Sequence, residues 1–225
     1  MPAVKLHIGN TVIEPTETVR NLGVVFDSQM SMSPQVTSLS RSVTYHLRNI
    51  SRIRHYLDFD TCNNVVRSLI LSRLDYGNIL LLGSNVTEIA RLQRLENWAA
   101  KIIFLAAKKD HATPLLRELH WLPVRERIYY KAMLYVYKCL AGLGPDYLAS
   151  SLTLYIPGRQ GLRSATDATR LHVPKLHYRS FKSAADKAFA FIAPKLWNQL
   201  PVSVRSSNSL PVFKKGLKTF LFSET

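Results

Sequence analysis

No aspartate or glutamate stands next to another anywhere in the 225 residues of this chain. Adjacent carboxylates hold the two magnesium ions of nucleotidyl-transfer enzymes, so their absence argues against that chemistry. Two other acidic sites have simpler explanations than catalysis. Asp58 and Asp60 stand at a predicted helix start, where Asp60 fits a cap, and Asp110 beside His111 fits hydrogen bonding in a loop or cap. We assign no catalytic residue.

Cysteine and long apolar runs are scarce. Cys62 and Cys139 lie far apart, and neither has a cysteine or histidine at ligand spacing, so the sequence indicates neither a zinc site nor a disulfide framework. The longest apolar run, 69–82, is interrupted by Arg73 and Asp75 and is shorter than the roughly 18 residues of a membrane span. No signal-peptide layout opens the chain. We expect a soluble, intracellular protein without a membrane partner, in the nucleus or the cytoplasm.

Known catalytic and nucleotide-binding motifs are absent as well. The sequence contains no Gly-x-Ser-x-Gly, no glycine-rich phosphate loop ending in Lys-Ser or Lys-Thr, and no His-Glu-x-x-His. The glycines at 142 and 144 fit a helix stop followed by a turn. The sequence therefore predicts no metal site, no cofactor and no small-molecule substrate.

Positive charge is abundant. Thirty Lys and Arg face fifteen Asp and Glu, a formal charge of +15, and 47% hydrophobic residues suffice for a packed core. Such a charge favours a polyanionic partner, nucleic acid first and acidic membrane second, although it also serves solubility alone.

The hydrophobic pattern predicts a mainly α fold: a short N-terminal β-hairpin plus one strand, followed by a multi-helix bundle with an irregular basic segment. The hairpin spans 4–14 around Gly9 and Asn10, and the single strand spans 19–26. Apolar residues at spacings of three and four then predict the helices. Their ranges are 34–54, 60–79, 85–105, 113–119, 123–142, 181–199 and 210–222, with the irregular stretch at 153–177.

Two basic features are candidate binding surfaces. On the helix at 34–54, Arg41, Arg48, Arg52 and His55 form one stripe opposite the apolar face, which suits a phosphate backbone but also fits an ordinary solvated face. The last seventy-five residues are more basic still, and Trp197 among them suits either base stacking or the core, with core favoured. The Lys and Arg there are residues 159, 163, 170, 175, 179, 182, 187, 195, 205, 214, 215 and 218.

Six phrases in series resemble the reverse transcriptase of non-long-terminal-repeat (LINE) retrotransposons, particularly the jockey and chicken-repeat groups. They include Asn-Leu-Gly-Val within 19–27, Ser-Arg-Leu-Asp-Tyr at 72–76 and Leu-His-Trp-Leu-Pro-Val within 119–128. The other three are at 46–50, 92–97 and 193–201. Each phrase alone is weak, whereas the six in this order and spacing are specific.

The resemblance implies a domain layout and site residues. It makes 1–27 a remnant of palm strands, 28–109 a thumb-like helical region, and 110–225 a family-specific C-terminal helical region. Asn21 and Gly23 then lie near the primer-contacting hairpin, and Arg41, Arg48 and Arg52 lie on the thumb. The family's Ala-Asp-Asp turn belongs upstream of this chain. Gly77 stands where the family often has Cys, and 106–109 replaces a more arginine-rich run.

The resemblance predicts a catalytically incomplete fragment of an RNA-directed DNA polymerase. Such a fragment binds at most RNA or an RNA-DNA duplex through its basic residues. Its other expected partner is the missing upstream polymerase region, and magnesium is needed only by the full-length family enzyme. Two alternatives stay open: a non-functional relic of a decayed element, and a repurposed helical protein-interaction module.

Overall fold

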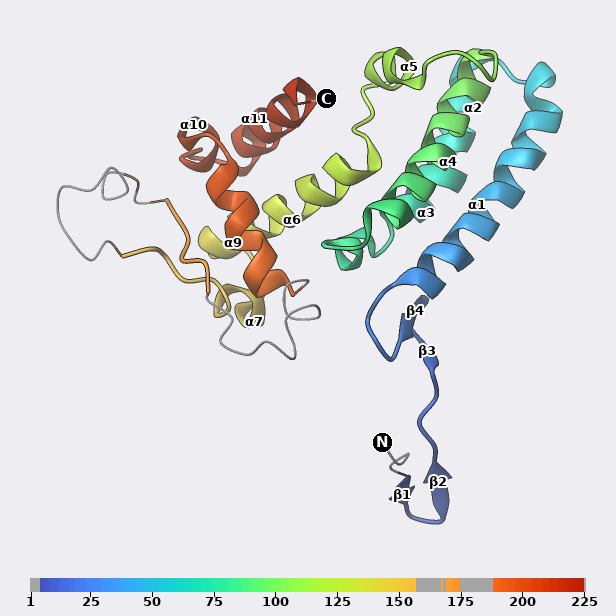
Figure 1. Ribbon diagram of the computed structural model, residues 1–225. Coiled ribbons are helices and arrows are strands. Elements are labelled where there is room, and N and C mark those ends of the chain that lie inside the picture. The colour runs from blue at the N-terminus through green and yellow to red at the C-terminus, as the bar shows by residue number, and fades with distance from the viewer. Residues whose placement is uncertain (1–4, 157–166, 168, 175–187, 225) are drawn as a thin grey trace.

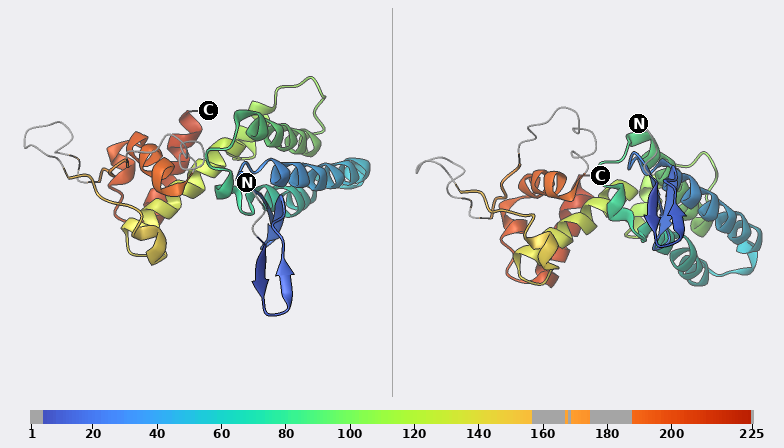
Figure 2. Two further views of the ribbon diagram at one scale, coloured as in Figure 1. Left: turned by 60° about the horizontal axis from the view of Figure 1, so that its bottom comes forward. Right: turned by 90° about the horizontal axis from the view of Figure 1, so that it is seen from below.

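The computed structural model describes residues 5–156, 167, 169–174 and 188–224, and its described part is mainly helical, which confirms the predicted fold class (Figure 1). A first hairpin pairs β1 (Leu6–Ile8) with β2 (Thr11–Ile13) in antiparallel register. The turn between these strands contains Gly9 at a φ of 58°. This hairpin stands away from the helices in Figure 1 and in the left view of Figure 2, and β2 is exposed along its whole length.

The next segment forms a second hairpin where the sequence predicted a single strand at 19–26. Strand β3 (Thr18–Asn21) pairs with β4 (Val24–Asp27). Leu22 and Gly23 connect them with φ angles of 46° and 81°. Positive φ at both central residues is the mark of a two-residue turn that matches the twist of its strands. The prediction missed it because Leu-Gly is a weaker turn signal than Asn-Gly.

Three helical segments after the hairpins form a bundle. Helix α1 spans Ser33–Ile53 and continues into η1 (Arg54–Tyr56). A continuous helical segment then runs through α2 (Phe59–Val66), the π-helical η2 (Arg67–Leu71) and α3 (Ser72–Asp75). After η3 (Asn78–Leu81), helix α4 spans Val86–Phe104. Each segment packs against the other two.

Two details of the predicted second helix are wrong. Its cap is Asp58, whose carboxylate accepts from the Thr61 backbone N–H at 2.8 Å, while Asp60 lies in the first turn. Its end is Asp75 and not residue 79. Tyr76 leaves helical geometry with a ψ of 118°, and Gly77 follows at a φ of 62°, a left-handed conformation that terminates the helix.

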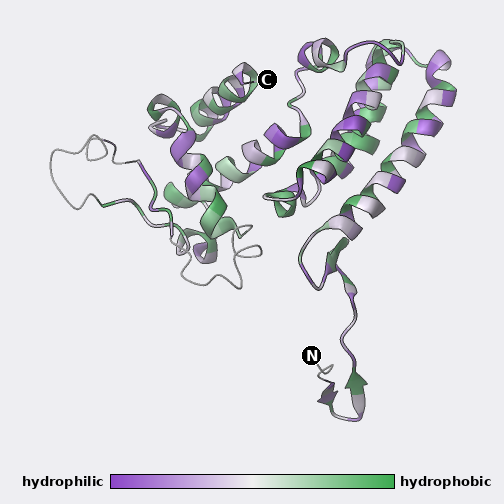
Figure 3. Cartoon of the chain, viewed as in Figure 1, coloured by the Kyte–Doolittle hydropathy of each residue, from purple (hydrophilic) through white to green (hydrophobic). Residues whose placement is uncertain are grey.

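Helices α1 and α4 run side by side in the same direction. Near their starts, Ser33 Oγ donates to Glu88 Oε1 at 2.7 Å, and at their ends Arg54 Nε donates to the Ile102 carbonyl at 2.9 Å. Hydrophilic and hydrophobic residues alternate along both helices (Figure 3). The predicted apolar faces are confirmed, since Leu47 of α1 and Leu92 of α4 are fully buried.

Helix α6 (Val124–Leu140) follows α5 (Ala112–Glu118) and joins the bundle to the C-terminal helices. Arg127 of α6 forms a bidentate ion pair with Asp75, its Nε lying 3.0 Å from Asp75 Oδ1, and this Nε also lies 3.9 Å from Glu96 Oε1. Gln93 Oε1 accepts from the Val124 backbone N–H at 2.8 Å, so this polar joint fastens α6 to α3 and α4.

Three C-terminal helices pack on the far part of α6: α7 (Asp146–Ala149), α9 (Phe189–Gln199) and α11 (Leu210–Ser223). The short α10 (Val202–Arg205) packs against α11. Phe213 of α11 stacks on Tyr137 of α6 with ring centroids 4.3 Å apart. Trp197 is 1% exposed, which confirms it as a core residue and not a base-stacking platform.

Part of the predicted irregular stretch is described. Leu154 and Leu171 form an antiparallel bridge, and the Asn198 side-chain amide pairs with both backbone groups of Leu171. Arg205 donates to the Asp167 carboxylate and holds the same segment against α9 and α10. The rest of the predicted stretch at 153–177, and the predicted helical residues 181–187, lie outside the described residues.

Candidate nucleic-acid interface

A groove between α1 and α4 brings five arginines together. Its volume is about 670 Å³, and Arg41, Arg48 and Arg52 of α1 face Arg91 and Arg94 of α4 across it. We call it the arginine groove. Its remaining lining consists of neutral side chains: Ser40, Thr44, Tyr45, Asn49 and Leu95. Arginines on two separate helices therefore concentrate positive charge in one channel.

The three predicted arginines of α1 are exposed along one side of the helix, as their spacing of seven and four requires. Within the part of the chain that the structure describes, no hydrogen bond or ion pair involves their guanidinium groups. Each guanidinium therefore presents its donors to solvent, in the planar arrangement that fits phosphate oxygens.

The two arginines of α4 were not among the sequence-predicted site residues. Arg94 is exposed, whereas Arg91 is half-buried and donates from Nη1 to Thr37 Oγ1 of α1 at 3.1 Å. A signal for them exists in the sequence, because Arg91, Arg94 and Lys101 recur at spacings of three and seven on one face of α4. Arg91 therefore helps to hold the two walls of the groove together.

The arginine groove continues at both ends. Arg41 also lines a hollow that reaches Val25 of β4 and the first turn of α1, and Arg94 also lines a hollow of about 780 Å³ at the ends of the two helices. None of the residues lining these three hollows is Asp or Glu. A phosphate chain following the groove would meet no carboxylate in its lining.

Arg54 differs from its neighbour Arg52 because it is buried and serves the fold. Its Nη2 donates to the Ile103 carbonyl and its Nη1 to the Leu57 carbonyl, both at 2.6 Å. With its bond from Nε to Ile102, the side chain donates to two carbonyls in the last turn of α4, where the regular helical hydrogen bonds end. Arg54 therefore fixes the spacing of α1 and α4 at this end of the groove.

Asn21 and Gly23, the other predicted site residues, do not line the arginine groove. They belong to the second hairpin, whose turn lies against Tyr76 at the end of α3. A Cβ added to Gly23 would lie 3.5 Å from the Tyr76 ring. The structure thus brings the three predicted arginines together and leaves these two residues in a separate, exposed turn.

The other candidate residues lie outside the arginine groove. Asp110 Oδ2 accepts from the Ala107 backbone N–H at 2.7 Å, which confirms its expected role in a loop. On α11, Lys214, Lys215 and Lys218 are exposed, and Lys218 Nζ lies 5.7 Å from the centroid of the Phe222 ring. Basic residues 159, 163, 175, 179, 182 and 187 lie outside the described residues.

Comparisons of the chain with protein-family models, curated protein sequences and solved structures gave no match. Across the described residues, no helix combines the length and the apolar character needed to cross a membrane. Within the same residues, no three His, Cys, Asp or Glu side chains gather closely enough to hold a metal ion.

Proposed function

We propose that this protein binds RNA or an RNA-DNA duplex through phosphate groups held in the arginine groove. The observation that carries the proposal is the convergence of five arginines from α1 and α4 on one groove whose lining contains no carboxylate. An ordinary solvent-exposed basic face would be explained by arginines on a single helix. Convergence from two helices concentrates the charge where a backbone could run.

Binding of this kind acts through released counterions and tolerates many sequences. If each of the five groove arginines neutralises one phosphate, the logarithm of the binding constant falls with the logarithm of salt with a slope of about −4.5. Contacts to phosphates position a protein without reading bases. The groove alone therefore predicts steep salt dependence and little sequence preference.

We further propose that the chain derives from a LINE-type reverse transcriptase and lacks polymerase chemistry. The series of six phrases supports this origin, and residues of several phrases contact one another. Tyr76 contacts Leu22, Asp75 pairs with Arg127, and Gln93 binds the Val124 backbone. Such contacts give a packing reason for these phrases to occur together. The sequence contains no adjacent carboxylates for the metals of nucleotidyl transfer.

The binding proposal is tested with a variant in which Arg41, Arg48 and Arg52 are all changed to Gln. Affinity for an RNA-DNA duplex is measured over a range of salt concentrations. The slope should flatten by about 2.7, the value for three lost phosphate contacts. The matched control changes Lys214, Lys215 and Lys218 of α11 to Gln, removing the same charge elsewhere.

The two variants distinguish binding in the arginine groove from binding that depends only on the net charge of the protein. A flattened slope in the groove variant and an almost unchanged slope in the α11 variant would support the site. Equal losses in both would assign binding to net charge and overturn the groove. No salt-sensitive binding by the unchanged protein would instead favour the relic or the interaction module. Unchanged circular dichroism is required of both variants.

A further inference from the structure

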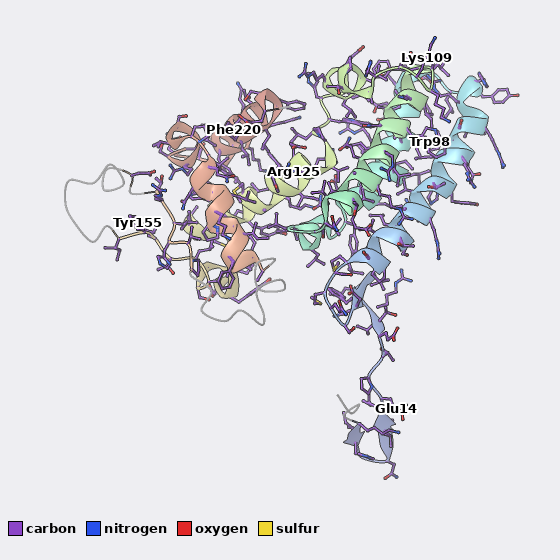
Figure 4. The ribbon with its side chains drawn as sticks, viewed as in Figure 1. Glu14, Trp98, Lys109, Arg125, Tyr155 and Phe220 are labelled. Atoms are coloured by element: carbon purple, nitrogen blue, oxygen red, sulfur yellow. The ribbon has the colours of Figure 1, made fainter. Side chains whose placement is uncertain are left out.

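The hollow at the ends of α1 and α4 differs in chemistry from the arginine groove that leads into it. We call it the Trp98 hollow. Alongside cationic side chains, its wall carries the indole of Trp98 and the aliphatic side chains of Ile102 and Leu105. Figure 4 labels Trp98 on α4. An aromatic side chain that is also packed against the core thus lies at the end of a basic channel.

Trp98 is the most accessible of the three tryptophans. Trp121 and Trp197 are 5% and 1% exposed, whereas Trp98 is only half-buried and lines the hollow. A fully buried indole serves packing. A half-buried one beside a volume of about 780 Å³ can also receive a ligand, since ligand pockets span roughly 300 to 1,000 Å³.

Polar groups surround the indole in a way that suits a nucleotide. Asn97 Oδ1 accepts from Gln93 Nε2 at 2.9 Å, and among the described residues no hydrogen bond uses the Asn97 Nδ2 donor. Lys101 and Lys108 both line the hollow, and Lys101 Nζ donates to the Lys108 backbone carbonyl at 2.7 Å. An amide donor suits a base edge, and the cations suit the adjacent phosphates.

We infer that the Trp98 hollow accepts an unpaired nucleobase, stacked on the Trp98 indole, from a strand whose phosphates follow the arginine groove. Arg94 lines both spaces, so one strand could occupy them in succession. The bases of an intact duplex are stacked on one another and cannot present a face to the indole. The inference rests on the proposed function and narrows its substrate to nucleic acid with a single-stranded segment or end.

The test uses the intact chain and two single strands with equal numbers of phosphates. One is a short oligo-dT, and the other is the same backbone with abasic sites throughout. Oligo-dT should quench tryptophan fluorescence and bind about tenfold more tightly than the abasic strand, because base stacking on an aromatic side chain contributes that much. Equal affinity for the two strands, or no quenching, would overturn the inference.

Two substitutions locate the effect. Trp98→Leu should abolish the preference for oligo-dT over the abasic strand while leaving the affinity and salt slope for the abasic strand unchanged. Trp98→Tyr should keep a preference for oligo-dT. If Trp98→Leu lowered the affinity for both strands equally, the result would contradict stacking of a base on Trp98. If that variant does not fold, the unchanged protein still tests the inference: oligo-dT should quench its tryptophan fluorescence, and the abasic strand should not.

The outcomes distinguish this inference from the proposed function. Failure of the inference leaves salt-dependent binding of the abasic strand, sensitive to Arg41→Gln and Arg48→Gln. Failure of the proposed function removes the salt-dependent binding of the RNA-DNA duplex as well as that of the abasic strand.

Discussion

The Tyr76 hydroxyl donates a hydrogen bond of 2.5 Å to the Leu22 carbonyl, although 54 residues separate the two in sequence. The ring of Tyr76 also lies against Gly23, and Gly77 places its Cα where an added Cβ would be 3.3 Å from Val24 Cγ2. The second hairpin is therefore fastened to the end of α3 at its turn. Leu22, Gly23, Val24 and Tyr76 belong to two of the six phrases, and Gly77 directly follows one of them.

Tyr76→Phe should loosen this turn and lower the free energy of unfolding by about 1 kcal/mol, the usual net contribution of one such hydrogen bond. Amide hydrogen exchange should accelerate in the second hairpin and remain unchanged in α6. Tyr56→Phe is the matched control, because Tyr56 is 88% exposed. Equal effects of the two substitutions would show that the hydroxyl of Tyr76 contributes nothing specific.

Arg54→Met should destabilise the bundle by about 3 kcal/mol, because it leaves carbonyls at the end of α4 without their charged donor. Arg52→Met removes the same charge from an exposed position and should change stability by at most about 0.5 kcal/mol. Urea denaturation of both variants measures the difference. Similar midpoints for the two would mean that solvent replaces Arg54 without cost.

Local periodicity predicted α1 and α4 because burial along a helix repeats every three or four residues. The same reasoning placed Arg41 and Arg48 on one face, since both lie on one helix. Arg91 and Arg94 were missed because the pairing of α4 with α1 depends on long-range contacts such as that of Arg91 with Thr37. Local sequence patterns do not predict which two helices pack together to form a groove.

Glu96 shows the same limit for a buried charge. Its place in a polar phrase gave no sign of burial, yet it is 0% exposed because α6 crosses α4 there. Burial raises the pKa of its carboxyl to about 7. The charge of Arg127, whose Nε lies 3.9 Å from Glu96 Oε1, lowers this pKa by a smaller amount. The environment of Glu96 thus depends on residues distant in sequence.

This raised pKa makes stability depend on pH. Between the unfolded value of 4.5 and about 7, the folded protein binds a proton that the unfolded chain has released. The contribution of Glu96 to stability therefore falls as pH rises through that window, by up to about 3 kcal/mol. Glu96→Gln should remove this decline, as measured by urea denaturation between pH 5 and pH 8.

Other groups titrate nearby, so the difference between the two proteins is the informative quantity. Burial and then the charge of Arg73 lower the pKa of His46, which makes stability rise toward pH 6.5 and opposes Glu96. Burial also raises the pKa of Glu126, with the same sign as Glu96. Parallel pH profiles for the unchanged protein and Glu96→Gln would contradict the assignment.

Substitution by alanine should have opposite effects on stability at two glycines. A Cβ at Gly144 would lie 2.7 Å from Cys139 Sγ and 2.9 Å from the Cys139 backbone nitrogen, so Gly144→Ala forces the chain apart and should cost more than about 1 kcal/mol. A Cβ at Gly216, inside α11, meets only Val204 Cγ2 at 3.7 Å. Gly216→Ala should stabilise by about 0.5 to 1 kcal/mol. Thermal denaturation compares them, and a stable Gly144→Ala variant would contradict this packing.

Arg94 provides the sharpest single test of the groove. It was not among the sequence-predicted site residues, and it lines both the arginine groove and the Trp98 hollow. Arg94→Gln should flatten the salt slope by about 0.9, the value for one phosphate contact. Arg67→Gln is the control, since Arg67 is exposed on the neighbouring helical segment and does not line the groove. Fluorescence anisotropy of a labelled RNA-DNA duplex, titrated at several salt concentrations, measures both slopes. A flattened slope for Arg67→Gln, or an unchanged one for Arg94→Gln, would place the phosphate contacts outside the groove.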